Sequence, residues 1–308
     1  MEPIYKFAKI GLVHFMAYPS TIKGEGPIIE TIKKIAVDDY FDAIEVTWIK
    51  DSETRKAAKK ILDSSHLTVA YGGQPRLLTT GLNINDLDNA KRQLAVTSLK
   101  EGIDEAYEIG AVGFGFLAGK YVEETKEEAY QALVKSTKEL CAYAKSKGNI
   151  KVALEVFDYD VDKCALIGPV ELAKRYAEEV CAEFDNFGLL VDLSHIPIIH
   201  ENIRQSVLPV KDYIIHAHMG NCMIKDKTDP AYGDHHPRFG YPGGENDVAE
   251  LVEYLKILLE IGYLNPNNRR ILSFEVKPVG DEDIDVVIAN SKRVLNLAWS
   301  LVENKKNA

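Results

Sequence analysis

The sequence predicts an α/β protein, a (β/α)8 TIM barrel that forms a single domain over residues 1–308. Short β-branched apolar runs alternate along the chain with longer amphipathic stretches, which is the pattern of strands that alternate with helices. Eight such units in a chain of 308 residues suit a closed barrel. An open doubly wound sheet is the alternative, but residues 14–26, after the first apolar run, lack its G-x-G-x-x-G phosphate turn.

Each predicted strand is nearly all apolar, as a parallel sheet covered by helices on both faces requires. The predicted strands are Ile10–Phe15, Ala43–Trp48, Thr68–Tyr71, Val112–Leu117, Lys151–Phe157, Gly188–Leu193, Ile214–Met219 and Ile271–Val276. The predicted helices are Ile28–Asp38, Ser52–Ser64, Asn89–Ile109, Glu127–Lys147, Pro169–Phe184, Ile203–Leu208, Asp247–Ile261 and Ile284–Glu303. Asp51 and Thr125 precede helices as N-caps, and Gly110, Gly148 and Gly262 follow helices as C-terminal stops.

Charge and cysteine content exclude several classes of protein. Asp and Glu total 47 against 37 Lys and Arg, a net charge of −10, which argues against a nucleic-acid partner because such binders present basic faces. No apolar run of about 20 residues predicts a membrane span, and the N-terminal residues show no signal-peptide pattern. The 4 cysteines have no C-x-x-C spacing, so we expect reduced thiols in a cytoplasmic protein.

Ionisable residues stand at the ends of four successive predicted strands, from the fifth to the eighth. They are Glu155, then Asp192 with His195, then His216 with His218, then Glu275 with Lys277. In a TIM barrel the carboxyl ends of the strands carry the catalytic groups. A charged group in an apolar strand costs several kcal/mol unless it is paired, protonated or bound to a metal. One such residue fits a structural ion pair, but four in succession indicate an active site.

Carboxylates and an imidazole together form a mixed oxygen and nitrogen site. Such a site suits Mn²⁺, Mg²⁺, Co²⁺ or Zn²⁺ with open positions for a substrate oxygen. A sugar that bound through its carbonyl and the adjacent hydroxyl would have the carbonyl polarised, which eases removal of the neighbouring C–H proton. Carboxylates on opposite sides of the sugar could exchange that proton as base and acid.

The strand-end motifs E-V, D-x-x-H, H-x-H and F-E-x-x-P, in this order, resemble the sugar isomerase/epimerase superfamily of xylose isomerase-like TIM barrels. This superfamily includes the ketose 3-epimerases and the metal-dependent apurinic endonucleases. The segment FDAIEVTWI in the second strand is similar to the F-D-x-I-E stretch of the family and places Glu45 near the pocket. The resemblance covers residues 8–300.

The resemblance to the ketose epimerases implies one divalent metal, Mn²⁺ first among the choices. Its ligands would be Glu155, Asp192, His218 and Glu275. Glu155 and Glu275 would also be the acid/base pair, and His195 would contact the substrate.

Two positions depart from the ketose epimerases. Ile224 stands where they carry a substrate-holding Arg, and Val161 stands where they carry a second Glu. The substrate is therefore expected to be held differently from a free ketohexose.

The loop at about residues 220–246 is long for a compact domain and is expected to be functional. Asp234 and His236 in this loop resemble a D-x-H pair that binds a further metal in the apurinic endonucleases. The alternatives are a substrate-binding lid, in which His236 and Arg238 face hydroxyls or an anion, and a plain surface loop.

Three further residues carry open alternatives. His14, after the first strand, is expected either to transfer a proton or bind substrate at the barrel mouth, or to be a packing histidine. Lys277 either binds a substrate oxygen or is a solvated cation at the rim. His216, which lies deeper than His218, is expected to be a hydrogen-bonded barrel histidine.

The predicted function is isomerisation or epimerisation of a sugar or keto-sugar. The alternative is elimination, because the first-strand opening HFMAYP and the 220–246 loop are similar to the catalytic subunits of C-glycoside deglycosidases. These subunits cleave 3-oxo-C-glycosides and pair with a small β-rich subunit. We expect a sugar or glycoside substrate and either a homo-oligomer or a hetero-oligomer with such a subunit. An endonuclease and a non-catalytic barrel are the remaining, weaker hypotheses.

Overall fold

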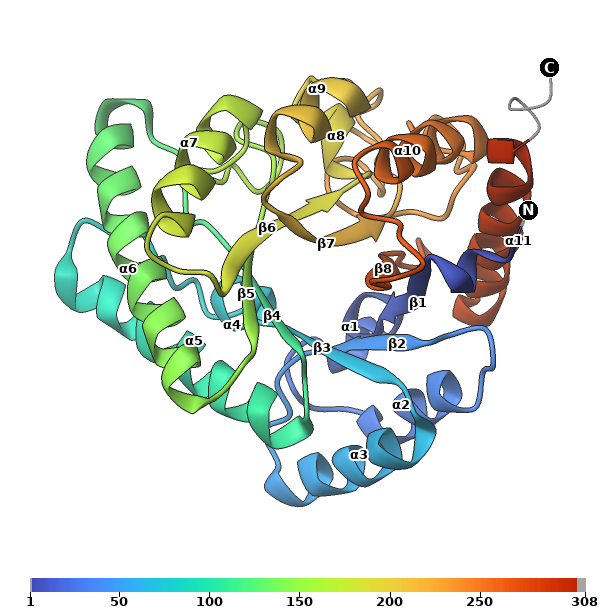
Figure 1. Ribbon diagram of the computed structural model, residues 1–308, viewed down its shortest axis with the longest axis horizontal. Coiled ribbons are helices and arrows are strands. Elements are labelled where there is room, and N and C mark those ends of the chain that lie inside the picture. Colours follow the sequence, from blue (N-terminus) through green and yellow to red (C-terminus); the bar gives the residue numbers. More distant parts are fainter. Residues whose placement is uncertain (1, 304–308) are drawn as a thin grey trace.

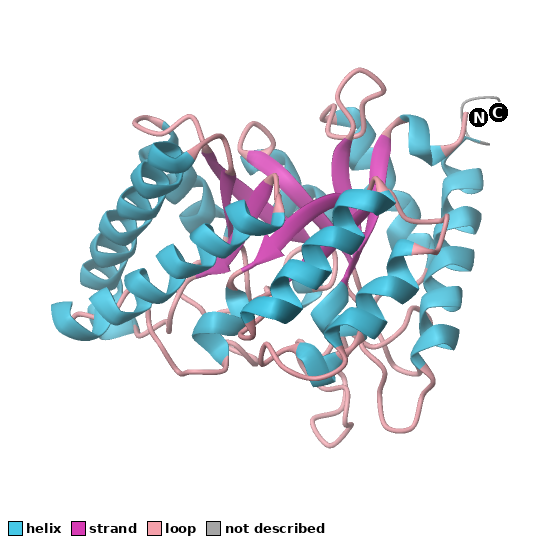
Figure 2. Ribbon diagram, turned by 90° about the horizontal axis from the view of Figure 1, so that it is seen from below, coloured by secondary structure: helices cyan, strands magenta, loops and turns pink. Residues whose placement is uncertain are grey.

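The computed structural model describes residues 2–303, which form a closed barrel of eight parallel strands surrounded by helices (Figures 1 and 2). The strands pair in chain order, and β1 closes the barrel against β8. The strands are β1 Ala8–Val13, β2 Ala43–Val46, β3 Thr68–Gly72, β4 Gly113–Leu117, β5 Lys151–Glu155, β6 Phe187–Asp192, β7 Ile214–Met219 and β8 Arg270–Phe274. The predicted fold class is thus confirmed.

The main difference from the predicted strands lies at their carboxyl ends. β5 ends at Glu155 rather than at Phe157, and β8 ends at Phe274, so Glu275 follows the strand. Apolar side chains continue past these ends because they pack under the loops, and such positions cannot be told from strand by hydrophobicity alone.

Helices cover the outside of the barrel, as the sequence predicts, and all of them except the five-residue α9 are long. They are α2 Ile28–Ala36, α3 Ser52–Ser65, α5 Asn89–Ile109, α6 Lys126–Lys147, α7 Val170–Cys181, α9 Ile203–Val207, α10 Val248–Glu260 and α11 Ile284–Glu303. Asp51 caps α3 by accepting the Thr54 N–H at 2.7 Å, whereas Thr125 precedes α6 without a capping side-chain hydrogen bond.

Three short helices were not predicted, and each follows a strand directly. They are α1 His14–Ala17, α4 Gln74–Leu78 and α8 His195–Ile198. Each has only four or five residues, too few to show a helical period in the sequence. They place side chains over the carboxyl end of the barrel.

The strand register fixes which side chains point into the barrel. Glu155 pairs with Leu117 and Leu190, and His218 pairs with Asp192 and Ser273. Because side chains alternate across a strand and parallel neighbours keep the same face, Glu155, Asp192, His218 and Glu275 all belong to the inward face at the carboxyl end. The opposite face, with Ile10, Leu12 and Leu154 for example, packs against the helices in the main core.

The long loop between β7 and α10 contains no helix, and a buried amide closes its base. Asn221 is fully buried, its amide donates to the Arg238 carbonyl at 3.0 Å, and its side-chain oxygen accepts the Glu245 and Asn246 N–H groups. One side chain therefore joins the two ends of the loop and its middle. Within residues 2–303, no helix has the length and apolar character to cross a membrane.

His14 does not lie at the barrel mouth as an acid/base group, which corrects the functional alternative for this residue. It lies on the outward face after β1, is only 2% exposed, and its Nε2 lies 2.7 Å from Thr31 Oγ1 on α2. Thr31 Oγ1 donates its own proton to the Pro27 carbonyl, so the His14 Nε2–H is the donor to Thr31. His14 is a neutral packing histidine.

His14 predicts a pH dependence of stability. Burial lowers the pKa of His14 from 6.5 to about 3. Between these two pH values the unfolded chain binds a proton at His14 and the folded chain does not. Stability should therefore fall as the pH drops from 6.5 towards 3, by up to about 1.4 kcal/mol per pH unit from this residue. Urea unfolding at pH 7 to 4.5 should show a shallower loss in His14→Gln than in the parent protein; equal slopes would contradict the assignment.

Candidate metal centre

Four side chains from adjacent strand ends converge on one point inside the barrel. Glu155 ends β5, Asp192 ends β6, His218 lies in β7 and Glu275 follows β8. His218 Nδ1 lies 2.6 Å from Glu275 Oε2, 3.5 Å from Glu155 Oε1 and 3.6 Å from Asp192 Oδ2. One donor atom from each of the four lies within 4.8 Å of the others.

These converging atoms fit a metal ion because they have no other partner. Glu155 Oε1, Asp192 Oδ2, His218 Nδ1 and Glu275 Oε2 are all buried and make no hydrogen bond among the described residues. A buried polar atom without a partner costs about 1–3 kcal/mol, and more when the group is charged. Three carboxylates and one imidazole form the oxygen-rich donor set that Mn²⁺ and related divalent ions accept.

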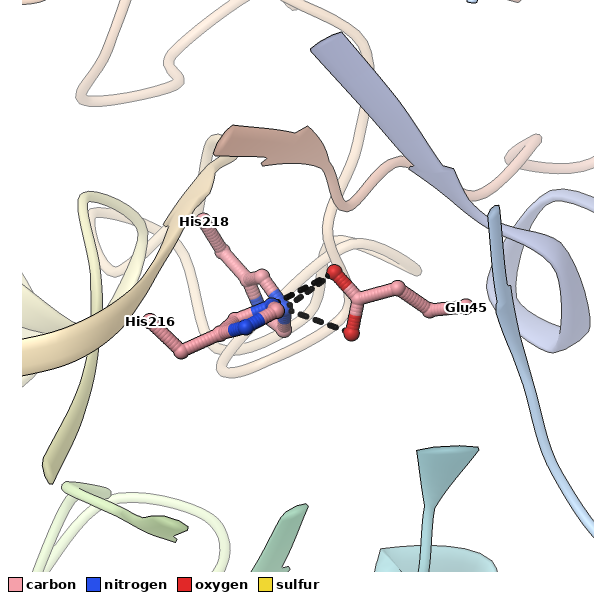
Figure 3. Close-up of side chains that lie close together, drawn as sticks. All are labelled: Glu45, His216 and His218. Carbon is pink, nitrogen blue, oxygen red and sulfur yellow. Dashed lines mark hydrogen bonds and ion pairs between the residues drawn. The ribbon is translucent and has the colours of Figure 1, made fainter. Parts of the chain in front are cut away.

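Glu45 orients His218 from the other side of its ring (Figure 3). The His218 Nε2 lies 3.1 and 3.2 Å from the two Glu45 carboxylate oxygens, and His216 Nε2 lies 2.7 Å from Glu45 Oε1. A carboxylate that accepts one ring N–H leaves the other nitrogen as the ligand and fixes the ring plane. Glu45 thus presents Nδ1 of His218 to the three carboxylates, and His216 is the hydrogen-bonded barrel histidine that the sequence predicts.

The charges of Glu45 and His218 depend on each other. Burial opposes ionisation of Glu45, but His216 and His218 outweigh it and hold the pKa of Glu45 well below its usual range. Burial likewise opposes the charge of His218, but Glu45 and Glu275 outweigh it and raise the pKa of His218 well above its usual range. A proton on His218 therefore competes with a metal ion for the same position.

Gln74 is a site residue that the sequence analysis missed. It begins α4, directly after β3, and its Nε2 donates to Glu155 Oε2 at 2.7 Å. This contact leaves Glu155 Oε1 free to face the other three residues. No motif marks Gln74, and the only signal is its place after a strand end.

The long loop brings Asp234 and His236 into contact with His195. His195 Nε2 lies 3.0 Å and His236 Nε2 lies 2.8 Å from Asp234 Oδ1. The second Asp234 oxygen pairs with Lys163 at 3.0 Å. The loop is therefore anchored on the centre by a buried carboxylate, and His236 lies beside the predicted ligands Asp192 and Glu275.

Both loop-linked histidines carry raised pKa values. Burial opposes their charge, but Asp234 outweighs it for His195, whose pKa lies well above its usual range. Glu275 and Asp234 outweigh burial for His236 and raise its pKa to about 9. His195 Nδ1 lies 2.7 Å from the Val156 carbonyl, so it is the donor there, and Nε2 is in ion-pair contact with Asp234 when the ring is charged.

Asp192, His195 and His236 also form a second group that could hold a cation. Asp234 lies between the two histidines in this structure, and its Oδ1 is in ion-pair contact with both.

Arg238 makes its side-chain hydrogen bonds away from the four predicted ligands. Its Nε donates to Glu282 at 2.9 Å and its Nη1 donates to the Gly240 carbonyl at 3.0 Å. These contacts use the guanidinium to tie the loop to the segment before α11. Lys277 anchors the same loop through its backbone, whose N–H donates to the His236 carbonyl at 2.8 Å.

Val161, which stands where the ketose epimerases carry a second Glu, lies in a segment whose fold explains the difference. Asp158 is buried, and its carboxylate accepts the backbone N–H groups of Val161, Asp162, Lys163 and Cys164. This short segment after β5 is thus folded around Asp158. The Asp158 carboxylate therefore binds backbone N–H groups and does not face the pocket.

Substitutions at the centre should change metal affinity. In calorimetric Mn²⁺ titrations of metal-stripped protein at pH 7, Glu275→Gln should weaken one site at least tenfold because it removes a charged ligand. Glu45→Gln should weaken the same site about 10- to 100-fold by releasing the His218 ring. The exposed Glu128→Gln serves as the control and should bind as the parent does. Affinity that is unchanged in both variants would contradict the ligand assignment.

Comparisons with known proteins agree with the barrel fold. The model of the xylose isomerase-like TIM barrel family matches residues 34–289. No curated protein sequence matches the chain significantly.

Several solved structures share the fold at low sequence identity. A D-tagatose 3-epimerase-like protein is 20% identical with a TM-score of 0.73, over 97% of this chain and 100% of that chain. The D-psicose 3-epimerase of Clostridium cellulolyticum H10 is 17% identical with a TM-score of 0.68, over 96% and 99%. The 3-keto-D-glucoside 4-epimerase of E. coli is 16% identical with a TM-score of 0.65, over 94% and 99%. Because the family model matches residues 34–289, which are most of this chain, the chain belongs to the xylose isomerase-like TIM barrel family.

Proposed function

We propose that this protein is a divalent-metal-dependent isomerase or epimerase that moves a proton next to the carbonyl of a sugar or keto-sugar. The observation that carries the proposal is the meeting of four buried donor atoms from Glu155, Asp192, His218 and Glu275, which make no hydrogen bond and contact one another. A folded protein retains such a costly group of atoms when a ligand completes it.

Glu155, Asp192, His218 and Glu275 would hold the ion, and we propose Mn²⁺ as the first choice, with Mg²⁺, Co²⁺ or Zn²⁺ as alternatives. When bound, the ion supplies electrophilic polarisation of a substrate carbonyl. The proton transfers fall to the carboxylates of the chain.

We propose Glu155 and Glu275 as the acid/base pair. They come from β5 and from the end of β8, with β6 and β7 between them, so they approach a bound sugar from two sides. One carboxylate takes the proton from carbon and the other returns a proton to the opposite face, which inverts that carbon. Return of the proton to the neighbouring carbon would be isomerisation. Burial raises the pKa of Glu275 to about 6.

The substrate class is proposed from the family and its neighbours. The solved structures with this fold include enzymes named for D-tagatose, D-psicose and a 3-keto-D-glucoside. We propose His195, His236 and Lys277 as contacts to substrate oxygens, because the two histidines lie beside the metal centre and Lys277 follows Glu275 by two residues. Asp234 would keep both histidines charged and oriented.

Deuterium exchange tests this proposal. Ketohexoses and 3-keto-glucosides incubated in D₂O with the Mn²⁺-loaded protein should gain deuterium at the carbon next to the carbonyl, seen by NMR. Glu155→Gln and Glu275→Gln should each slow the exchange about 10²- to 10⁴-fold, because each removes one proton-transfer group. Glu128→Gln should exchange at the parental rate.

The same assay distinguishes epimerisation or isomerisation from elimination. Deuterated epimer or isomer supports the proposal, whereas release of the aglycone from a 3-oxo-C-glycoside would identify the elimination alternative. Absence of exchange with every substrate, or exchange that both variants retain, would overturn proton transfer by Glu155 and Glu275.

A further inference from the structure

The barrel is hollow below the metal centre. A cavity of about 370 Å³ extends from Gln74 and Glu275 at the carboxyl end to the amino ends of the strands. Its lower lining includes Lys9, Thr68, Lys151 and Arg270, which are the first or second residues of β1, β3, β5 and β8. Lys151 is exposed and the other three are partly exposed, so the cavity opens at the amino-end face, opposite the face expected to admit the sugar.

Small residues create this space. The register places Ala70, Gly113 and Ala153, which line the cavity, on the inward face, where TIM barrels usually carry layers of bulky branched side chains. A Cβ added to Gly113 would meet no atom closer than the Lys151 carbonyl oxygen, at 3.9 Å. A larger side chain at Gly113 would therefore grow into empty space.

The inner part of the cavity carries polar groups. His216 and Glu45 both line it, and the His216 side chain is 11% exposed although it lies inside the barrel. His218, one step nearer the metal centre, is only 3% exposed. The cavity thus reaches the histidine that shares Glu45 with a predicted metal ligand.

Uncompensated positive charge surrounds the opening. Lys9 donates to Thr68 Oγ1, Lys151 to the Asp185 carbonyl and Arg270 to the Ile214 carbonyl, all of them neutral acceptors. Among residues 2–303, none of these three cations has a carboxylate within ion-pair distance; the fourth cation at the opening, Arg269, pairs with Asp42. A cationic rim is notable in a chain whose net charge is −10.

We propose that the amino-end half of this cavity, whose other end is closed by the metal centre, is a second ligand site for a slim organic anion such as a short-chain carboxylate. The carboxylate would bind between Lys9 and Lys151, and the apolar chain would lie along Ala70, Gly113 and Ala153 towards His216. A volume of about 370 Å³ falls within the range of small-molecule sites.

Calorimetric titration of the metal-stripped full chain with butyrate, pentanoate and hexanoate tests the site. The salt concentration is held constant with chloride, at pH 7. Binding should show one site, with affinity rising about fourfold for each added methylene, the factor expected for burial of one CH₂ group.

Matched variants locate the binding. Gly113→Val should weaken hexanoate binding at least tenfold because its side chain occupies the cavity, and Lys9→Gln should weaken all three carboxylates. Lys33→Gln removes an exposed charge on α2 and should bind as the parent does. Thermal unfolding of each variant checks that it is folded, and Lys9→Gln provides the test if Gly113→Val does not fold.

Three outcomes would overturn the proposal. They are absence of binding, affinity that does not depend on chain length, which would indicate ion association at the surface, and parental affinity in folded Gly113→Val. None of these outcomes bears on the metal centre, so failure here leaves the proposed isomerase or epimerase untouched.

Discussion

Three carboxylates surround one imidazole inside the barrel, and the electrostatics of this group govern the rest of the site. Glu155, Asp192 and Glu275 are each at least nine-tenths buried, so their mutual repulsion is weakly screened. His218 carries the balancing charge, and it can do so because Glu45 holds its far nitrogen. Burial of these three carboxylates lowers the stability of the folded chain, and a bound cation would compensate their charge.

The surrounding residues serve this group in distinct ways. Gln74 occupies one oxygen of Glu155 and so directs the other inward. Asp234 joins His195 and His236 and connects the long loop to the centre, while Lys163 balances its charge from the segment after β5. Arg238 and Asn221 hold the same loop at points away from the centre. The loop is thus positioned by buried polar contacts at both ends and in its middle.

Sequence patterns predicted the barrel and a cluster of ionisable residues at the carboxyl ends of its strands, and the resemblance to the ketose epimerases selected the four converging residues from that cluster. The same patterns could not assign His14 or Arg238. The roles of these residues depend on Thr31 and Glu282, partners that are distant in the chain and that no local period identifies. Gln74 was not predicted because its helix, α4, is too short to show a helical period. The hollow interior follows from small residues on separate strands, whose common layer appears only with the register.

Anomalous diffraction from crystals grown with Mn²⁺ tests the metal centre most directly. One strong manganese peak bonded to Glu155, Asp192, His218 and Glu275 is the predicted result. A map with no peak at these four residues, or with a peak only among Asp192, His195 and His236, would contradict the assignment.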